Sequence, residues 1–271
     1  MRLTVLGVVA LSAALAPLTW AANHASSVFD VASGVNKVTL PAKKDTPKTT
    51  ITCHYYAKFM VKEVDEGEVG AAQLSIVPGD AAHKPACQRA NLANEKVVSA
   101  NDWGGYFKGV KGDYVFFDAD DGTNGAMGFA VFATDAKKLL EDSALGDFQE
   151  LTLDGTTLTM KYQRSVVGPC SVVKDGAACW AKIAAATGVA ATPAPDCAAG
   201  YVKAKNEMAK GRCEADKTPT QACMTKALKE LDAQRWNEAP SVIVFEAQTI
   251  IAADHATTTA SGPALACHPS D

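Results

Sequence analysis

Eight cysteines in a chain of 271 residues constrain the fold more than any other feature of the sequence. They all follow an apolar N-terminal segment: Cys53, Cys87, Cys170, Cys179, Cys197, Cys213, Cys223 and Cys267. An even number of cysteines in an exported chain favours disulfide bonds, because an oxidising compartment forms and preserves them. Structural zinc sites usually contain more closely spaced pairs than Cys170 and Cys179, which have eight residues between them. We therefore expect four disulfides rather than a zinc site.

The first 21 residues predict a secretory signal peptide. Arg2 supplies a positive charge, Leu3 to Leu18 is almost wholly apolar, and small residues flank Trp20. This order is typical of a signal peptide that is cleaved just after Ala21. A transmembrane anchor is the alternative, but Pro17 interrupts the run and no second apolar stretch reaches the ~20 residues of a spanning helix. We expect a periplasmic or secreted protein without a membrane span.

The composition limits the class of protein and its partners. A hydrophobic fraction of 48% is too high for a disordered chain. A formal net charge of -4 argues against a protein that binds the phosphates of nucleic acid. The length allows one large domain or two modest ones.

Changes in residue pattern divide the mature chain into four parts. Residues 22–48 form a polar N-terminal arm, with one short strand expected at Val38 to Leu40. Residues 49–167 show strand patterns and form the predicted β body. Residues 168–239 show helical patterns and form a cysteine-containing helical insertion. Residues 240–271 return to a strand pattern, followed by a tail. A lone strand is unstable, so we expect the last one to pair with the β body.

Alternating apolar residues and turn signals define the β body. Apolar residues at alternate positions from Ile51 to Val61 predict one half-buried strand. Glycine-containing turns follow apolar runs at Asp118–Gly125 and at Asp154–Gly155, which predicts two hairpins. Several short strands at this spacing favour an antiparallel β-sandwich or a barrel-like body. The predicted class is mainly β with a small, disulfide-bonded helical subdomain.

The helical insertion contains three predicted helices. The first spans Ala178 to Ala186 and ends near Gly188, and Asp196 is a candidate N-cap for the second. Thr218 and Pro219 are candidates for the N-cap and first position of the third helix. The insertion has few large apolar residues, so disulfides would stabilise it most. One of them could join Cys213 to Cys223 between the second and third helices, while Cys267 could attach the tail.

The acidic segment Asp118–Gly125 is the first candidate site. Asp118, Asp120, Asp121 and Asn124 offer the oxygen ligands that Ca²⁺ prefers, and a calcium site at Asp118, Asp120 and Asn124 is one interpretation. The order of residues differs from that of an EF-hand loop, and aspartate, asparagine and glycine are also the usual residues of solvated turns. The turn is the favoured interpretation.

Aromatic residues near this segment form the second candidate site. Trp103 and Tyr106 flank two glycines just before the hairpin at residue 114. Exposed aromatic rings can bind a peptide or a sugar with little loss of side-chain entropy. Core filling at the start of a strand is the simpler interpretation. Trp103, Tyr106, Asp118, Asp120 and Asp121 are the candidate ligand-binding residues.

Several local catalytic motifs are absent from the sequence, which leaves open a Ser/His/Asp triad whose members would meet only in the fold. The sequence contains no G-x-S-x-G elbow, no H-E-x-x-H pair, no P-loop and no G-x-G-x-x-G. No two of its five histidines lie within four residues of each other, so none forms a local metal pair.

The patterns favour an exported binding protein for a protein, peptide or glycan ligand, with no cofactor other than calcium. A secreted hydrolase using carboxylates of Asp118–Asp121 is an alternative. A structural envelope factor that contacts its partner through the helical insertion is another. The sequence leaves open whether the protein is an enzyme, and it favours binding.

Overall fold

The computed structural model describes residues 28–42, 44, 47–80, 83–190, 193–215 and 220–270. The predicted signal peptide and its cleavage point lie outside these residues. The elements along the chain are β1 (Gly34–Leu40), β2 (Thr49–Tyr55), β3 (Phe59–Asp65), β4 (Gln73–Pro78), β5 (Lys96–Val98), β6 (Tyr106–Lys111), β7 (Tyr114–Thr123), β8 (Ala126–Ala133), β9 (Lys138–Ala144), β10 (Glu150–Asp154), β11 (Thr157–Val167), α1 (Val172–Thr187), α2 (Cys197–Ala215), α3 (Gln221–Ala233), the 3-10 turn η1 (Trp236–Glu238), β12 (Ser241–Ala252) and β13 (His255–Pro269).

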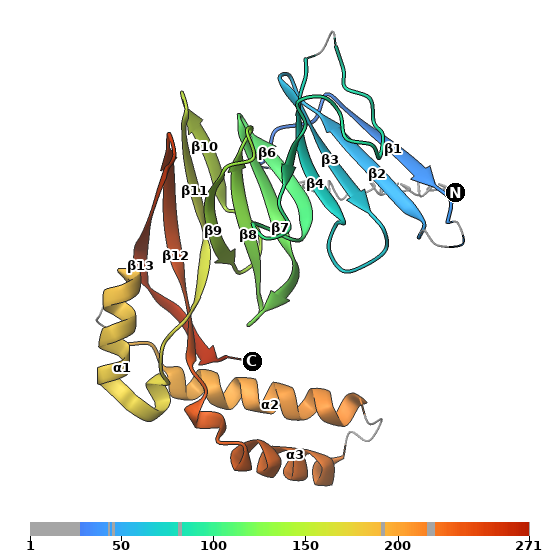
Figure 1. Cartoon of the computed structure of the whole chain (residues 1–271). Coiled ribbons are helices and arrows are strands. Elements are labelled where there is room, and N and C mark those ends of the chain that lie inside the picture. The colour runs from blue at the N-terminus through green and yellow to red at the C-terminus, as the bar shows by residue number, and fades with distance from the viewer. Residues whose placement is uncertain are drawn as a thin grey trace, which may run out of the picture.

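The strands form two antiparallel sheets, and the helices lie at one end of the second (Figure 1). The first sheet has the order β1-β2-β3-β4-β5. The second has the order β13-β12-β11-β9-β8-β7-β6, with β10 beside β11. The predicted mainly β class with helices is confirmed. The barrel alternative is wrong, because β13 and β6 stay unpaired edges among the described strands.

A hydrophobic core fills the space between the two sheets. Phe59, Val61 and Ile76 of the first sheet pack with Phe117 and Phe132 of the second, and all five side chains are buried. Burying a side chain of this kind contributes ~1.5–3 kcal/mol to folding. This packing agrees with the predicted sandwich.

The outer face of the first sheet is covered by the chain between β4 and β5. Cys87 of this connection forms a disulfide with Cys53 of β2. The Tyr55 hydroxyl donates a hydrogen bond to the Pro85 carbonyl at 3.1 Å. Leu92 packs against the apolar residues of the same face. The first sheet is therefore buried on both faces over much of its area.

The second sheet carries a larger core on the face that points away from the first sheet. Phe129 and Tyr162 contact each other edge to face with ring centroids 5.3 Å apart, and Phe148 from the β9–β10 connection packs on both. Trp180 and Ile183 of α1 belong to the same core. The first helix thus completes the β body rather than forming a separate unit.

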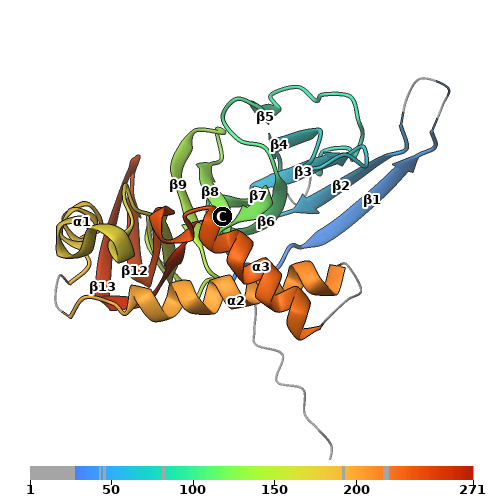
Figure 2. The same ribbon diagram turned by 90° about the horizontal axis from the view of Figure 1, so that it is seen from below.

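The second and third helices lie side by side in both views and run across below the lower ends of the strands (Figure 1, Figure 2). The start of α2 is fixed to β13 by the Cys197–Cys267 disulfide. Gly200 allows this approach, since a Cβ there would lie 1.8 Å from the Cys267 carbonyl oxygen. The far ends of α2 and α3 are joined by the Cys213–Cys223 disulfide, as predicted.

The remaining disulfide joins Cys170 to Cys179, and no described cysteine is free. Four disulfides fit an extracellular or periplasmic protein. In the part of the chain that is described, no helix is both long and apolar enough to span a membrane.

The single strand predicted from Ile51 to Val61 is wrong, because the structure has two strands there. The chain turns at residues 56–58, where the Tyr56 amide donates to the Phe59 carbonyl at 2.8 Å. Tyr55 pairs with Met60 across this turn. Odd-numbered residues therefore change faces: Cys53 lies on the outer face and Val61 lies in the core between the sheets.

The predicted loop at Asp118–Gly125 is also wrong in its extent. β7 continues to Thr123, with an irregularity in its pairing between Asp118 and Gly122. Only Asn124 and Gly125 form the turn, with φ of 54° and 73°. A two-residue turn with two positive φ values matches the right-handed twist of the flanking strands. The acidic residues thus belong to a strand.

The starts of two helices differ in part from the prediction. α1 begins at Val172, where the Ser171 hydroxyl caps it by accepting from the Lys174 amide, but Gly176 interrupts the helix with φ of 60° and ψ of -140°. The stretch after this kink starts close to the predicted Ala178. α3 begins at Gln221, and the Thr220 hydroxyl caps it by accepting from the Cys223 amide. The predicted cap and first position, Thr218 and Pro219, lie outside the described residues.

The other helix limits agree with the sequence. α1 ends at Gly188, whose φ of 72° is the left-handed conformation that glycine adopts without strain. The Asp196 carboxylate accepts from the Ala199 amide at 3.0 Å at the start of α2. The predicted tail differs, because it forms β13 and pairs along β12.

Candidate functional site

The candidate residues Trp103, Tyr106, Asp118 and Asp120 come together at one end of the β6–β7 hairpin, which we call the Asp118 end (residues 103–108 and 118–121). Tyr106 and Asp118 are cross-strand partners. The Trp103 Nε1 donates to the Asp118 carbonyl at 3.2 Å, and the Tyr106 hydroxyl accepts from the Gly70 amide at 2.8 Å. These polar atoms already have partners within the protein.

The carboxylates of the Asp118 end are arranged differently from one another. The Lys108 ammonium lies 2.8 and 2.9 Å from the two oxygens of Asp118. Asp120 lies against Gly70, while Asp121 accepts a hydrogen bond from the next backbone amide, that of Gly122. Lys108 donates a hydrogen bond to Asp118 Oδ2, while the buried Oδ1 has the Lys108 ammonium 2.8 Å away but no hydrogen-bond partner among the described residues. The predicted calcium site at Asp118, Asp120 and Asn124 stays a prediction.

Two titratable side chains of the first sheet complete the Asp118 end. The Glu63 carboxylate accepts a hydrogen bond from the Phe107 amide at 2.7 Å, which covers part of the free edge of β6. Burial raises the pKa of Glu63 although this hydrogen bond opposes the shift, and Asp65 adds to the increase. The His54 ring packs on Phe107 with centroids 4.6 Å apart, and burial lowers the pKa of His54.

The opposite end of the β6–β7 hairpin forms a groove that the sequence did not reveal. In an antiparallel sheet alternate turns lie at the same end, so the β6–β7, β8–β9, β10–β11 and β12–β13 turns gather there. The β2–β3 turn of the first sheet joins them (Figure 1). We call this region the turn-end groove.

The turn-end groove consists of two adjoining cavities of about 350 and 470 Å³. Lys58, Gly112 and Asp113 line both of them. The cavity on the second sheet is also lined by Tyr114, Ala133, Thr134, Leu139, Leu153, Gly155, Thr156 and Ala253. The cavity toward the first sheet is also lined by Asp30, Val31, Ser33, Tyr56, Ala57 and Phe59. Cavities of this size with mostly apolar walls and few polar groups are typical of ligand sites.

An exposed ion pair separates the two cavities. The Lys58 ammonium lies 3.0 and 2.9 Å from the two Asp113 oxygens. The two side chains are 72% and 54% exposed. Such a pair stabilises a fold by less than about 1 kcal/mol. Both side chains can therefore turn toward a ligand at little cost.

Aromatic side chains form the floor of the cavity toward the first sheet. The Tyr56 and Phe59 rings are stacked, with centroids 5.4 Å apart and an interplanar angle of 28°. Burial and the nearby Asp30 carboxylate raise the pKa of Tyr56 to about 12. The hydroxyl of Tyr56 thus keeps its proton at neutral pH and can donate a hydrogen bond.

The N-terminal segment forms the rim of this cavity. The Asp30 amide donates to the Val110 carbonyl at 2.8 Å, and the Asp30 carboxylate accepts from the Gly112 amide at 2.7 Å. These contacts hold Val31 at the rim, where its side chain is 91% exposed. An apolar side chain held in solvent in this way is available to a ligand.

Groups of metal-binding side chains with ligand atoms close together are scarce in the described part of the chain. The one group of three with ligand atoms close together is Cys170, Asp175 and Cys179, within 4.8 Å of one another. The two sulfur atoms form a disulfide, and a disulfide lacks the thiolates that bind metals.

Comparison with known proteins gives no family to which the chain can be assigned. No protein-family model matches it, and neither a curated protein nor a solved structure does.

Proposed function

We propose that the protein is an exported, non-catalytic binding protein that holds an extended peptide segment in the turn-end groove. The observation that carries this proposal is the junction of two ligand-sized cavities at Lys58 and Asp113. The chain that builds the groove comes mostly from turns on a rigid sheet, an arrangement that binding proteins often use.

The chemistry of the groove fits a peptide main chain. At the junction, Lys58 offers hydrogen-bond donors and Asp113 offers acceptors, which complement peptide C=O and N–H groups. The two cavities, whose walls are mostly apolar, lie on either side of this polar junction, and we call each of them a lobe of the groove. Side chains two residues apart in an extended peptide point the same way and lie ~7 Å from each other. One such side chain would enter each lobe.

Binding is favoured over hydrolysis by the state of the carboxylates. Asp118 is paired with Lys108, and Asp113 is paired with Lys58. The Asp30 carboxylate accepts a hydrogen bond from the Gly112 amide and lies 3.4 Å from the Lys111 ammonium. Acid–base hydrolysis needs carboxyl groups that can face the substrate, whereas these three are already held by partners within the protein.

Peptide display tests the proposal. Peptides selected on the mature protein would be measured against Val31→Asp and Leu153→Asp, which place a charge in each lobe. Leu265→Asp is the control, because Leu265 is a comparably exposed leucine on β13, away from the turns. We expect each groove variant to weaken binding by about tenfold or more, as expected for an unpaired charge in an apolar contact. Equal affinity for all three variants would overturn the proposal.

A further inference from the structure

A third cavity, of about 440 Å³, lies on the outer face of the first sheet. It is separate from the turn-end groove and shares no lining residue with it. Its walls are Val64, Ala72, Gln73, Arg89, Ala90 and Asn91. We call it the amide pocket, because two side-chain amides form its polar wall.

A buried ion pair lies next to the amide pocket. The Lys62 side chain is fully buried and that of Glu95 is 1% exposed. The Lys62 ammonium lies 2.7 and 2.9 Å from the two Glu95 oxygens. Replacing such a pair by apolar residues is often neutral for stability, so its presence is weak evidence of a stabilising role.

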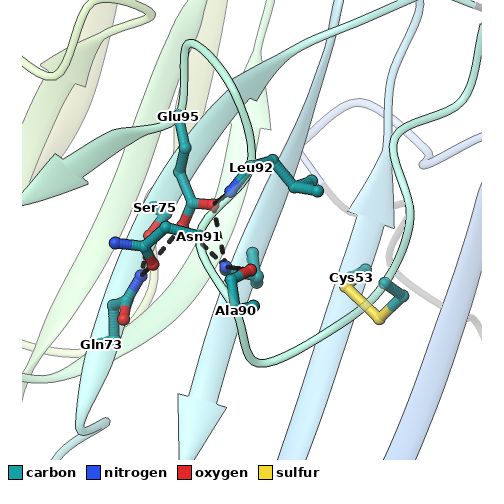
Figure 3. A network of polar contacts seen from close by, with 9 residues as sticks. Cys53, Gln73, Ser75, Ala90, Asn91, Leu92 and Glu95 are labelled. Carbon is teal, nitrogen blue, oxygen red and sulfur yellow. Dashed lines mark hydrogen bonds and ion pairs between the residues drawn. A yellow bond between two sulfur atoms is a disulfide. The ribbon is translucent and has the colours of Figure 1, made fainter.

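The Glu95 carboxylate is the centre of a hydrogen-bond network that reaches the pocket (Figure 3). It accepts from Gln73 Nε2 at 2.9 Å and from the Leu92 amide at 2.7 Å. Burial alone would raise the pKa of Glu95, but hydrogen bonds from Lys62, the Leu92 amide and Ser75 outweigh it and lower the pKa. Glu95 is therefore a fixed anion to which the neighbouring side chains are oriented.

The network fixes which atoms the two amides present to the pocket. Gln73 Nε2 donates toward Glu95, and it also lies 2.9 Å from Asn91 Oδ1 and from Ser75 Oγ. The Asn91 amide nitrogen and the Gln73 carbonyl oxygen take no part in these bonds. Figure 3 shows the Asn91 nitrogen pointing away from Glu95. The pocket wall thus leaves an amide nitrogen that can donate and a carbonyl oxygen that can accept to a ligand.

The charge at the pocket is balanced. The Arg89 guanidinium is paired with Glu66, so the wall does not carry a net positive charge that would select an anion. A hydroxyl group both donates and accepts hydrogen bonds, and therefore suits a wall that offers both. The apolar side chains Val64 and Ala72 provide the rest of the surface.

We propose that the amide pocket binds a neutral, polyhydroxylated ligand of sugar size, with Gln73 and Asn91 as its binding residues. Lys62 and Glu95 act as positioning residues, since they hold the Gln73 amide in one orientation. The Cys53–Cys87 disulfide attaches the same connection to β2, which further reduces the loss of freedom on binding. This proposal does not depend on the turn-end groove.

Titration of the isotope-labelled mature protein with glucose and with N-acetylglucosamine, followed by NMR, tests the proposal. We expect saturable shifts at millimolar sugar for the Ala72, Ala90 and Asn91 backbone amides and for the two side-chain amides. Asn91→Ala should weaken binding by about tenfold, as for the loss of a ligand-specific hydrogen bond. Asn101→Ala, at another exposed asparagine, should leave it unchanged. No saturable shift, or shifts outside the pocket, would overturn the proposal.

The role of the ion pair has its own test in the double variant Lys62→Met/Glu95→Gln. The glutamine carbonyl can still accept a hydrogen bond, so we expect a melting temperature close to that of the wild type. Without the charged acceptor, the Gln73 amide protons should exchange faster with solvent and sugar affinity should fall several-fold. Unchanged affinity in this folded variant would show that the pair has only a structural role.

Discussion

The two ends of the β6–β7 hairpin show opposite ways of using polar residues. At the Asp118 end, the Trp103 indole, the Tyr106 hydroxyl and the Asp118 carboxylate each have a partner inside the protein. At the turn-end groove, Lys58 and Asp113 are paired with each other in solvent, between two cavities. Residues of similar chemistry therefore stabilise the fold at one end and remain available to a ligand at the other.

Residue type alone therefore does not distinguish a ligand-binding site from a structural cluster. Aromatic rings beside carboxylates occur at both ends. What differs is how far each side chain is exposed to solvent: Lys108 and Asp118 are 15% and 26% exposed, whereas Lys58 and Asp113 are 72% and 54% exposed. The same substitution at the two ends should accordingly have very different consequences.

The largest difference is expected for glycine-to-alanine substitutions at the two ends. Gly105 has a φ of +134°, and a Cβ there would lie 1.9 Å from the Asp118 carbonyl oxygen. Gly112 has a φ of +60°, and its Cβ would meet only the end of the Leu153 side chain, at 2.6 Å. We expect Gly105→Ala to lower the free energy of unfolding by more than about 3 kcal/mol. Gly112→Ala should lower it by about 1 kcal/mol.

Chemical denaturation of the mature protein measures both values. Equal losses for the two variants would contradict the contrast between a close-packed end and an open one.

The next largest difference is expected for the two lysines. Lys108 is 15% exposed and its partner Asp118 26%, and its ammonium also lies 5.5 Å from the centre of the Phe148 ring. Lys108→Met leaves a half-buried carboxylate without its cation and should cost about 2 kcal/mol of stability. Lys58→Met removes an exposed pair and should change stability by no more than about 0.5 kcal/mol. Thermal unfolding compares them, and a larger loss for Lys58→Met would argue against the assignment of the two ends.

The smallest effect concerns pH. Burial raises the pKa of Glu63, so the folded protein binds this proton more tightly than the unfolded chain does. The wild type therefore gains stability from Glu63 as pH falls from neutrality through the folded pKa toward the unfolded value. Glu63→Gln keeps an acceptor for the Phe107 amide but should lose this gain.

His54 acts in the opposite direction, because its pKa is lowered and its contribution falls as pH drops below the unfolded value. Stability should therefore be measured as the difference between the wild type and Glu63→Gln across the acid range. A difference that does not change with pH would show that Glu63 is not the group responsible.

Local patterns predicted much of the β architecture. Alternation and the Asn124–Gly125 turn placed the β7–β8 hairpin, and Asp154–Gly155 placed the β10–β11 hairpin. The β2–β3 turn was missed because residues 56–58 contain no glycine, proline, asparagine or aspartate. The alternation continues through it, although the odd-numbered residues lie on the outer face of the sheet in β2 and on the inner face in β3.

The sites were harder to predict because they depend on contacts between distant segments. The turn-end groove combines turns from five hairpins. The buried Lys62 looks like an ordinary surface lysine in the sequence, and only the connection that covers it supplies Glu95. The Asp118 end was found because its residues are close in sequence. Its partner Lys108 is equally close, yet nothing in the local pattern indicates which carboxylate Lys108 pairs with.

Hydrogen–deuterium exchange of the protein, with and without a display-selected peptide, distinguishes the turn-end groove from the Asp118 end as the binding site. If the turn-end groove is the binding site, exchange should slow in residues 56–59, 112–114 and 153–156 and stay unchanged at the Asp118 end. Protection confined to residues 103–108 and 118–121 would contradict the account and identify the Asp118 end as the site.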